Sequence, residues 1–230
     1  MARPLIIAID GPAGAGKSTV SKILARRLDF VLVDTGAIYR CVALKARQLG
    51  IAFDDDAGLE KLLGQLKLGF HVEEELNHVF LDGVDVSEAI RTPEISMLAS
   101  QVSGRPFVRS MLLGLQRRLA LEAPKGAILE GRDIGTVVFP EADLKVFLFA
   151  DPEIRARRRF EELFEKGVEK PIGQVLSDQN KRDKEDSERD VAPLKAADDA
   201  VKVDSTLLPL SEVVQQIETR VLALVPPAGA

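Results

Sequence analysis

The sequence Gly-Pro-Ala-Gly-Ala-Gly-Lys-Ser at residues 11–18 matches the pattern G-x-x-x-x-G-K-[ST] in full. An apolar run, Leu5–Ile9, closely precedes it, and Thr19–Leu28 has apolar residues at helical spacing after it. A phosphate-binding loop needs a buried strand before it and a helix after it, because backbone N–H groups at the helix start point at phosphate oxygens. The stretch therefore predicts a site for a nucleoside triphosphate.

Each part of this loop has an expected role. Three glycines let the backbone curl so that its N–H groups point inward at phosphate oxygens. Lys17 is expected to reach the β- and γ-phosphates, and the Ser18 hydroxyl to bind Mg²⁺. The alternative, a glycine-rich turn that binds nothing, is disfavoured by the flanking strand and helix. The expected nucleotide contacts are Gly11, Pro12, Ala13, Gly14, Ala15, Gly16, Lys17, Ser18 and Thr19.

Length and composition favour one globular domain, with room for inserted lobes. The chain has 230 residues and a net charge of −5, so no basic field suits nucleic acid, and anionic ligands must be held by local arginine clusters. The single cysteine, Cys41, excludes an intrachain disulfide and is expected to be a small buried side chain in a reducing compartment.

The sequence predicts neither a transmembrane helix nor a signal peptide. No apolar stretch approaches the ~20 residues of a transmembrane helix. The apolar run before Asp10 has only five residues and is too short for the core of a signal peptide. We therefore expect a cytoplasmic protein with no membrane partner.

Short continuous apolar runs alternate with helical segments, which predicts a three-layer α/β fold around a parallel sheet of five strands. The expected strands are Leu5–Ile9, Phe30–Val33, Ala127–Glu130, Lys145–Phe149 and Ala200–Val203. The expected helices are 18–28, 37–49, about 105–122, about 152–166, about 172–190 and 210–224.

One stretch breaks the alternation. Lys67–Glu73 and Asn77–Leu81 look like an antiparallel hairpin, and Asp82-Gly83 reads as a second tight turn leading into Val84–Val86. We take residues 55–105 as a lobe inserted into the parallel core, and expect residues 226–230 to fray.

Polar segments follow the second and third core strands, at the sheet edge where open α/β sheets bind ligands. Asp34 or Thr35 is expected to cap the next helix, in which Tyr39 is either a core residue or a functional one. An Arg132-Asp133 pair stands between Gly131 and Gly135, and a structural ion pair is the alternative to a functional role.

Charged residues also cluster on two later helices. Arg182, Asp186 and Arg189 have i, i+4, i+7 spacing and share one helical face, with helical salt bridges as the alternative. A solvated face is likewise the alternative for Arg155, Arg157, Arg158 and Arg159. Asn180-Lys181-Arg182-Asp183 matches a guanine-reading signature, but it follows helix-spaced residues rather than a buried strand, so we reject a GTPase.

The ordered set of motifs resembles the bacterial cytidylate kinase family over about residues 5–205. The stretches that carry the resemblance are IDGPAGAGKST (9–19), DTGAIYR (34–40), IRTPE (90–94), ASQVS (99–103), Arg109, EGRDIGTVVFP (130–140), KRD (181–183) and RDVAPL (189–194). The resemblance implies a P-loop nucleoside monophosphate kinase fold with a CMP-binding insert and a helical lid. It places a single domain over 1–230, with a core of about 1–54 and 106–225, the insert at about 55–105 and the lid at about 153–190.

The resemblance also assigns roles to particular residues. Ser100 and Arg109 look like the pair that hydrogen-bonds cytosine. The surroundings of the CMP phosphate would be Thr35, Tyr39, Arg40 and Arg132. Asp186 and Arg182 are similar to ribose contacts, and Arg189 to an arginine that faces a phosphate.

The remaining roles concern ATP and its metal. Lid arginines such as Arg158 would serve ATP, and Asp133 would orient Arg132 or a water on Mg²⁺. Glu130 and Ser18 differ from the residues of some relatives, so Thr19 is expected to share the metal.

Taken together, these features predict Mg²⁺- and ATP-dependent phosphorylation of CMP and dCMP by a monomer. The enzymatic alternatives are a UMP/CMP, shikimate or dephospho-CoA kinase. The non-enzymatic alternative is a nucleotide-dependent switch, which would lack a second anion site such as Arg132, Arg182 and Arg189 would form.

Overall fold

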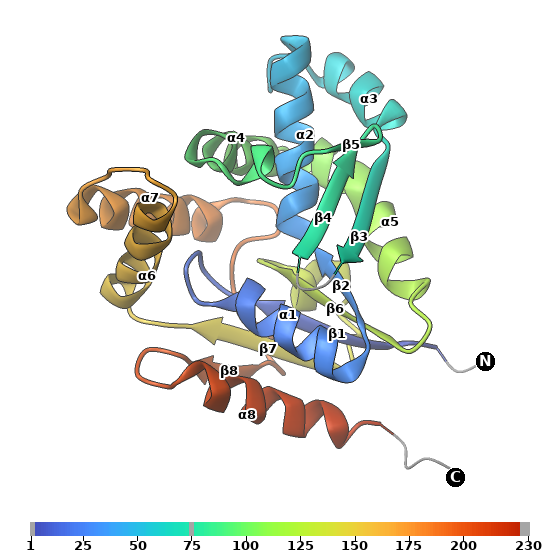
Figure 1. Ribbon diagram of the computed structural model, residues 1–230. Coiled ribbons are helices and arrows are strands. Elements are labelled where there is room, and N and C mark those ends of the chain that lie inside the picture. Colours follow the sequence, from blue (N-terminus) through green and yellow to red (C-terminus); the bar gives the residue numbers. More distant parts are fainter. Residues whose placement is uncertain (1–2, 74–75, 226–230) are drawn as a thin grey trace. The chain divides into compact units, whose positions relative to one another are not determined.

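The computed structural model describes residues 3–73 and 76–225, and Figure 1 shows the order of the elements. The predicted fraying of residues 226–230 concerns a segment outside this range. The chain divides into two compact units, Met1–Val33 with Arg117–Ala230, and Asp34–Gln116. Each unit is described by itself below.

The first unit is built on a five-stranded parallel sheet in the order β2-β6-β1-β7-β8. Its strands are β1 (Leu5–Asp10), β2 (Val31–Asp34), β6 (Gly126–Gly131), β7 (Leu144–Phe149) and β8 (Val201–Asp204). The central strand β1 pairs with β6 and β7, so that Asp10 lies opposite Gly131 and Phe147. All five predicted strands are confirmed, with ends that differ by one residue.

Helices α1 (Lys17–Leu28) and α8 (Leu210–Leu222) share one hydrophobic core with this sheet. Val20 and Leu24 of α1 and Ile217 of α8 are buried against Ile7 and Ile128 of the strands. Figure 1 shows the two helices together on one face of the sheet. This burial explains the apolar spacing that predicted α1, because one stripe of the helix faces the core.

Two further helices, α6 (Pro152–Glu165) and α7 (Ile172–Glu188), carry a small core of their own. Its members are Ala156, Leu163, Val175 and, partly buried, Leu176. The rejected guanine signature lies inside α7, so its residues follow helix rather than strand, as the sequence indicated.

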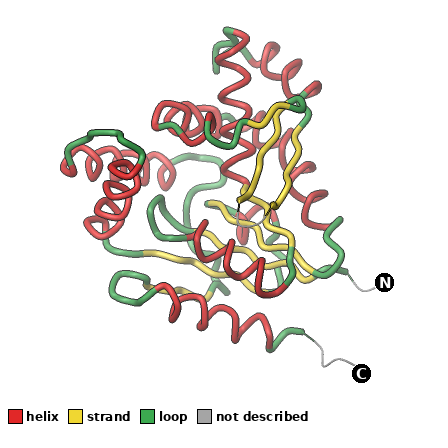
Figure 2. The backbone as a smooth tube through the Cα atoms, viewed as in Figure 1, coloured by secondary structure: helices red, strands yellow, loops and turns green. Residues whose placement is uncertain are grey.

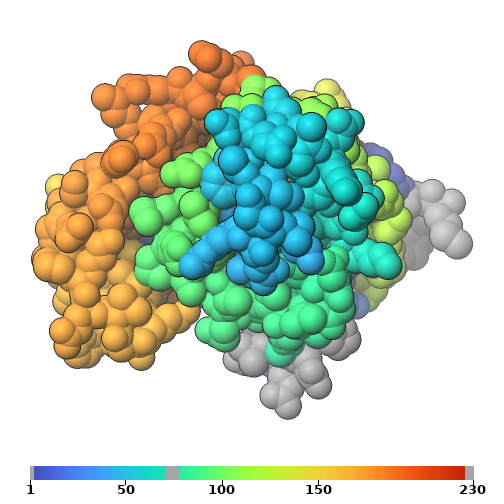
Figure 3. Space-filling view, turned by 90° about the horizontal axis from the view of Figure 1, so that it is seen from above, coloured from blue at the N-terminus to red at the C-terminus, as the bar shows by residue number. Residues whose placement is uncertain are grey.

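The second unit combines helices with a three-stranded antiparallel sheet, drawn in yellow in Figure 2. Its elements are α2 (Thr35–Leu49), α3 (Asp56–Gln65), β3 (Leu68–Glu73), β4 (Leu76–Leu81), β5 (Val84–Asp85), a 3₁₀ turn (Ala89–Arg91), α4 (Pro93–Ser103) and α5 (Pro106–Leu121), which continues into the first unit. The surfaces of α2 and α3, blue to cyan, face the viewer in Figure 3.

The hairpin prediction is confirmed, and its second turn follows from local sterics. Asp82 and Gly83 both have positive φ, 52° and 84°, which is the geometry of a two-residue turn between antiparallel strands. Cys41 is buried in the core of this unit, and burial raises the pKa of its thiol to about 12. A small inert side chain was the expectation.

Two helices and two short turns were not predicted. Helix α3 buries only Leu59 and Leu62, so its apolar periodicity is faint. Helix α4 begins with a Thr92 cap followed by Pro93 and Glu94, a start signal that the sequence analysis passed over. The two turns are the 3₁₀ turn Ala89–Arg91 and a π-type turn at Ile134–Val138, directly after the Arg-Asp pair.

Candidate active site

The phosphate loop joins β1 to α1 with the backbone that its glycines require. Gly11, Gly14 and Gly16 all have positive φ, and a Cβ on Gly11 would lie 1.9 Å from the Leu148 carbonyl oxygen. Gly16 begins α1 in the left-handed region and contributes no side-chain cap. The first N–H groups of α1 therefore form an anion-binding end of the kind that a phosphate caps.

Lys17 is held beneath this loop. Its Nζ donates to the Pro12 carbonyl oxygen at 2.7 Å, and the residue is only 8% exposed. Burial lowers the pKa of Lys17 well below its usual value, and Arg132 lowers it further, against the opposing effect of Glu130 and Asp10. Because burial and positive neighbours both disfavour the ammonium, a polyphosphate anion at this point would stabilise it.

The Ser18 hydroxyl donates to Glu130 Oε2 at 2.8 Å. This pair joins the start of α1 to β6 and puts a hydroxyl beside a carboxylate, both hard oxygen donors of the kind that Mg²⁺ takes. Among residues 3–73 and 76–225, no group of three or more His, Cys, Asp or Glu side chains could hold a metal by itself. The donor set fits a magnesium ion that also binds phosphate oxygens and water, as Mg²⁺ usually does.

Four predicted substrate residues meet beside the loop after β6. Arg132 Nε donates to Asp186 Oδ2 at 2.9 Å, and Arg189 lies 3.6 Å from the other oxygen of the same carboxylate. Burial would raise the pKa of Asp186, but Arg132, Arg182 and Arg189 outweigh it and hold that pKa below the usual value. One carboxylate thus gathers three arginines, which gives the first unit a cluster of positive charge.

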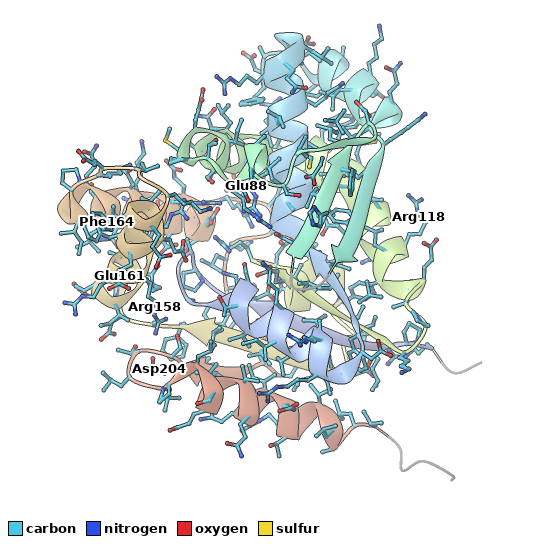
Figure 4. All side chains as sticks on the ribbon, in the orientation of Figure 1. Glu88, Arg118, Arg158, Glu161, Phe164 and Asp204 are labelled. Atoms are coloured by element: carbon cyan, nitrogen blue, oxygen red, sulfur yellow. The ribbon has the colours of Figure 1, made fainter. Side chains whose placement is uncertain are left out.

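Helix α6, in the predicted lid, reaches the phosphate loop through Arg155 rather than through Arg158. Arg155 Nη1 donates to the Ala13 carbonyl oxygen at 2.9 Å and to the Asp183 carboxylate. Arg158 donates to the hydroxyl and the carbonyl oxygen of Ser205, and Figure 4 shows it near Asp204, the last residue of β8. The predicted ATP contact of Arg158 stays a prediction.

Ser205 was missed by the sequence analysis, as was Asp183. The Ser205 hydroxyl lies 3.1 Å from the Ala15 carbonyl oxygen, so the turn after β8 supports the phosphate loop. Asp183 approaches the other side of that loop, where it lies 3.4 Å from the Ala13 nitrogen. The only signal for Asp183 was its place in the KRD stretch, which gave it no role of its own.

In the second unit, Asp34 organises the start of α2. Its carboxylate accepts from the Ala37 N–H at 2.8 Å, which confirms Asp34 as the helix cap, and from Arg40 Nη2 at 2.9 Å. Thr35 is buried in the first turn of the same helix. The two predicted phosphate residues Thr35 and Arg40 therefore belong to one helix start with a fixed geometry.

Tyr39 and Arg109 lie together in this unit. The Arg109 guanidinium carbon is 5.4 Å from the centre of the Tyr39 ring, a cation–π distance, and Arg109 is 8% exposed. Gln116 donates to the Tyr39 hydroxyl at 3.4 Å. The sole tyrosine is thus both packed and in contact with the predicted base reader.

Ser100 is linked to Arg109 through a residue that the sequence analysis missed. The Ser103 hydroxyl donates to the Ser100 carbonyl oxygen at 3.0 Å, and Arg109 Nη1 donates to the Ser103 carbonyl oxygen at 3.1 Å. The end of α4 and the first turns of α5 therefore fix the predicted base-reading pair within one hydrogen-bonded group.

Within the described ranges, 3–73 and 76–225, no helix is long and apolar enough to cross a membrane.

Comparison with known proteins relates these features to one family. The model of the Cytidylate kinase family matches residues 7–222. A cytidylate kinase of Geobacter sulfurreducens is 52% identical over 217 residues, which are 94% of this chain and 92% of the relative. A cytidylate kinase of Azotobacter vinelandii is 46% identical over 223 residues, 96% of each chain.

Solved structures are more distant. A gluconokinase from Sinorhizobium meliloti 1021 has a TM-score of 0.48 and 17% identity, with 96% of this chain and 93% of the other covered. A likeness at this level does not bear on the substrate.

Proposed function

Because the chain belongs to the cytidylate kinase family, we propose that it transfers the γ-phosphoryl group of ATP to CMP and dCMP. The observation that carries this proposal is the complete phosphate loop beside a second cluster of positive charge, formed by Arg132, Arg182 and Arg189 around Asp186. A kinase that joins two polyanions needs positive charge for both of them. Membership of this family argues against a shikimate kinase, a dephospho-CoA kinase and a nucleotide-dependent switch.

The acceptor needs no strong base. A phosphate monoester has a second pKa near ~6, so a CMP phosphate oxygen is already anionic at neutral pH. It attacks the γ-phosphorus in line with the leaving ADP oxygen, and the difficulty is charge rather than proton transfer. Lys17 and the arginine cluster compensate this charge, and Asp133 helps to orient the cluster.

Ser18 and Glu130 would hold the magnesium ion that accompanies ATP, with Thr19 next to them. When bound, the ion neutralises charge on the β- and γ-phosphates. The Ser18–Glu130 hydrogen bond at 2.8 Å already brings these donors together.

Base recognition falls to Ser100 and Arg109 in the second unit. Cytosine offers acceptors at N3 and O2 and a donor at N4, whereas uracil offers a donor at N3 and an acceptor at O4. A site that donates to N3 or O2 and accepts from N4 leaves mismatched groups against uracil, at ~1–3 kcal/mol for each buried one. We expect CMP to exceed UMP by at least ~10²-fold in kcat/KM from two such mismatches.

The other site residues complete the proposal. Thr35, Tyr39 and Arg40 contact the CMP phosphate region, Asp186 and Arg182 the ribose, and Arg189 a phosphate. Arg158 of the lid binds ATP, and for this its hydrogen bonds to Ser205 must break. The protein works in the cytoplasm as a monomer, and the net charge of −5 agrees with small anionic substrates held locally rather than nucleic acid.

The test follows ADP release from ATP and Mg²⁺ in the presence of CMP, dCMP, UMP, AMP or GMP. We expect turnover that depends on the second nucleotide, with CMP and dCMP far ahead of AMP and GMP. Equal ADP release with and without CMP would indicate an ATPase and overturn the proposal.

A further inference from the structure

Asp10, the last residue of β1, accepts two hydrogen bonds from the turn that follows β6. Its Oδ1 accepts from the Ile134 N–H and its Oδ2 from the Gly135 N–H, each at 2.8 Å. The residue is 5% exposed, and each carboxylate oxygen takes one amide. Such charge-assisted bonds are stronger than those between neutral groups.

These amides begin the π-type turn Ile134–Val138. In that turn Val138 N donates to the Asp133 carbonyl oxygen and Phe139 N to the Ile134 carbonyl oxygen, so the first amides have no acceptor within the turn itself. Asp10 supplies that acceptor from another strand. Its position therefore fixes where the turn begins, and with it the preceding residues Arg132 and Asp133.

Asp10 is also covalently tied to the phosphate loop. It directly precedes Gly11, whose φ of 148° and close approach to the Leu148 carbonyl oxygen hold the loop start in one conformation. A single carboxylate thus links the phosphate loop to the turn that directly follows Arg132 and Asp133.

We propose that Asp10 is a positioning residue for phosphoryl transfer. It fixes the position of Arg132, through the turn that follows it, relative to the phosphate loop. This role rests on the proposed kinase function and goes beyond it, because Asp10 acts through Arg132 rather than on a substrate. A shift of about 1 Å in a catalytic group costs about 10²-fold in rate, so such a link affects turnover more than binding.

The contact depends on the ionised carboxylate. Burial raises the pKa of Asp10 to about 6, against the two backbone N–H groups that lower it; Asp133 raises it and Lys17 lowers it. Protonation turns one carboxylate oxygen into a hydroxyl, which accepts an amide N–H less well. The link between the two loops therefore weakens as the pH falls through about 6.

The chain offers a matched control for an Asp10→Asn variant. Asp143 also accepts a backbone N–H of β1, from Ile6 at 2.8 Å, but at the other end of the strand and in an ion pair with Arg3. Asp143→Asn therefore perturbs the same strand by the same chemical change, away from the phosphate loop.

The experiment measures kcat and the KM for ATP with saturating CMP. For Asp10→Asn we expect kcat to fall about 10- to 100-fold, with less than about a twofold change in the KM for ATP, because the glycines and Lys17 stay in place. Asp143→Asn should keep kcat within about twofold of the wild type. Equal kcat values for the two variants, or a KM for ATP that rises as much as kcat falls, would overturn the proposal.

A pH profile separates positioning from plain structural support. The ratio of wild-type kcat to that of Asp10→Asn should be large at pH 7–8 and fall toward pH 5, and the ionisation of ATP and CMP cancels in this ratio. A ratio that does not change with pH would contradict the role of the ionised carboxylate.

Asp10→Ser, with one acceptor and no charge, repeats both measurements should Asp10→Asn not fold. A wild-type enzyme without CMP-dependent turnover would overturn the proposed function itself. A normal wild type with an unaffected Asp10→Asn would overturn only the role of Asp10.

Discussion

The buried carboxylate of Asp10 is expected to cost stability at neutral pH, and Asp10→Asn measures that cost. Its pKa rises from 3.8 to about 6 on folding, mainly through burial. A raised carboxyl pKa contributes stability that is fully present below pH 3.8 and is lost as the pH rises through about 6. The shift is about 2 pKa units at 1.36 kcal/mol each, which gives about 3 kcal/mol.

The assay is urea-induced unfolding of the wild type and Asp10→Asn between pH 4 and pH 7. Circular dichroism follows the transition, since the chain has no tryptophan. The free energy of unfolding of Asp10→Asn, relative to that of the wild type, should rise by about 2 kcal/mol across this range, because at pH 4 part of the total of about 3 kcal/mol is already lost. Carboxyl groups of lowered pKa, such as Asp186, act in the opposite direction but cancel in the difference. A difference that stays constant within about 0.5 kcal/mol would show that folding does not raise the pKa of Asp10.

Three further substitutions test other parts of the site. Lys17→Ala should lower kcat by at least about 10²-fold without lowering the melting temperature, because it removes a buried charge that acts in the transition state; a folded variant with most of its activity would argue against this loop. Arg109→Met should lower kcat/KM for CMP and lower the ratio of kcat/KM for CMP to that for UMP, with little change in ATP affinity. Arg118→Met, on an exposed face of the same helix α5, should change neither quantity (Figure 4). If Arg109→Met leaves that ratio unchanged, Arg109 does not recognise the base. Asp186→Asn should cost about 3–5 kcal/mol in the free energy of unfolding by urea, because it leaves the three arginines around it without their shared carboxylate; a loss below about 1 kcal/mol would show that solvent compensates these charges.

The parallel core was predictable because its strands are continuous apolar runs that are buried on folding. Leu5–Asp10 is such a run, and its predicted and observed ends differ only at Asp10. The role of that residue could not be read from the sequence. Asp10 there only follows an apolar run, whereas in the structure its carboxylate accepts hydrogen bonds from a turn that is far away in the sequence.

The elements of the second unit were predictable only in part. The alternation of apolar and polar residues and the Asp82-Gly83 turn indicated the hairpin. Such a turn can be recognised from adjacent residues alone, because only certain residue types adopt positive φ. Helix α3 buries too little apolar surface to leave a clear period. The cap at Thr92 was a usable signal for α4 that went unused.

Site residues were predictable by type and position, but their partners were not. The helical spacing placed Arg182, Asp186 and Arg189 on one face, and the structure adds that Arg132 from another element shares the Asp186 carboxylate. Arg155 and Arg158 look alike in sequence. Only tertiary contacts show that Arg155 bonds to the phosphate loop while Arg158 bonds to Ser205.

The most direct test of phosphoryl transfer from ATP to CMP follows the phosphorus atom itself. ATP labelled with radioactive phosphorus at the γ-position is mixed with CMP, Mg²⁺ and the enzyme, and the products are separated by thin-layer chromatography. We expect the label to appear in CDP, in step with ADP formation, and Lys17→Ala to abolish both. Label that accumulates as inorganic phosphate while CMP stays unlabelled would contradict it.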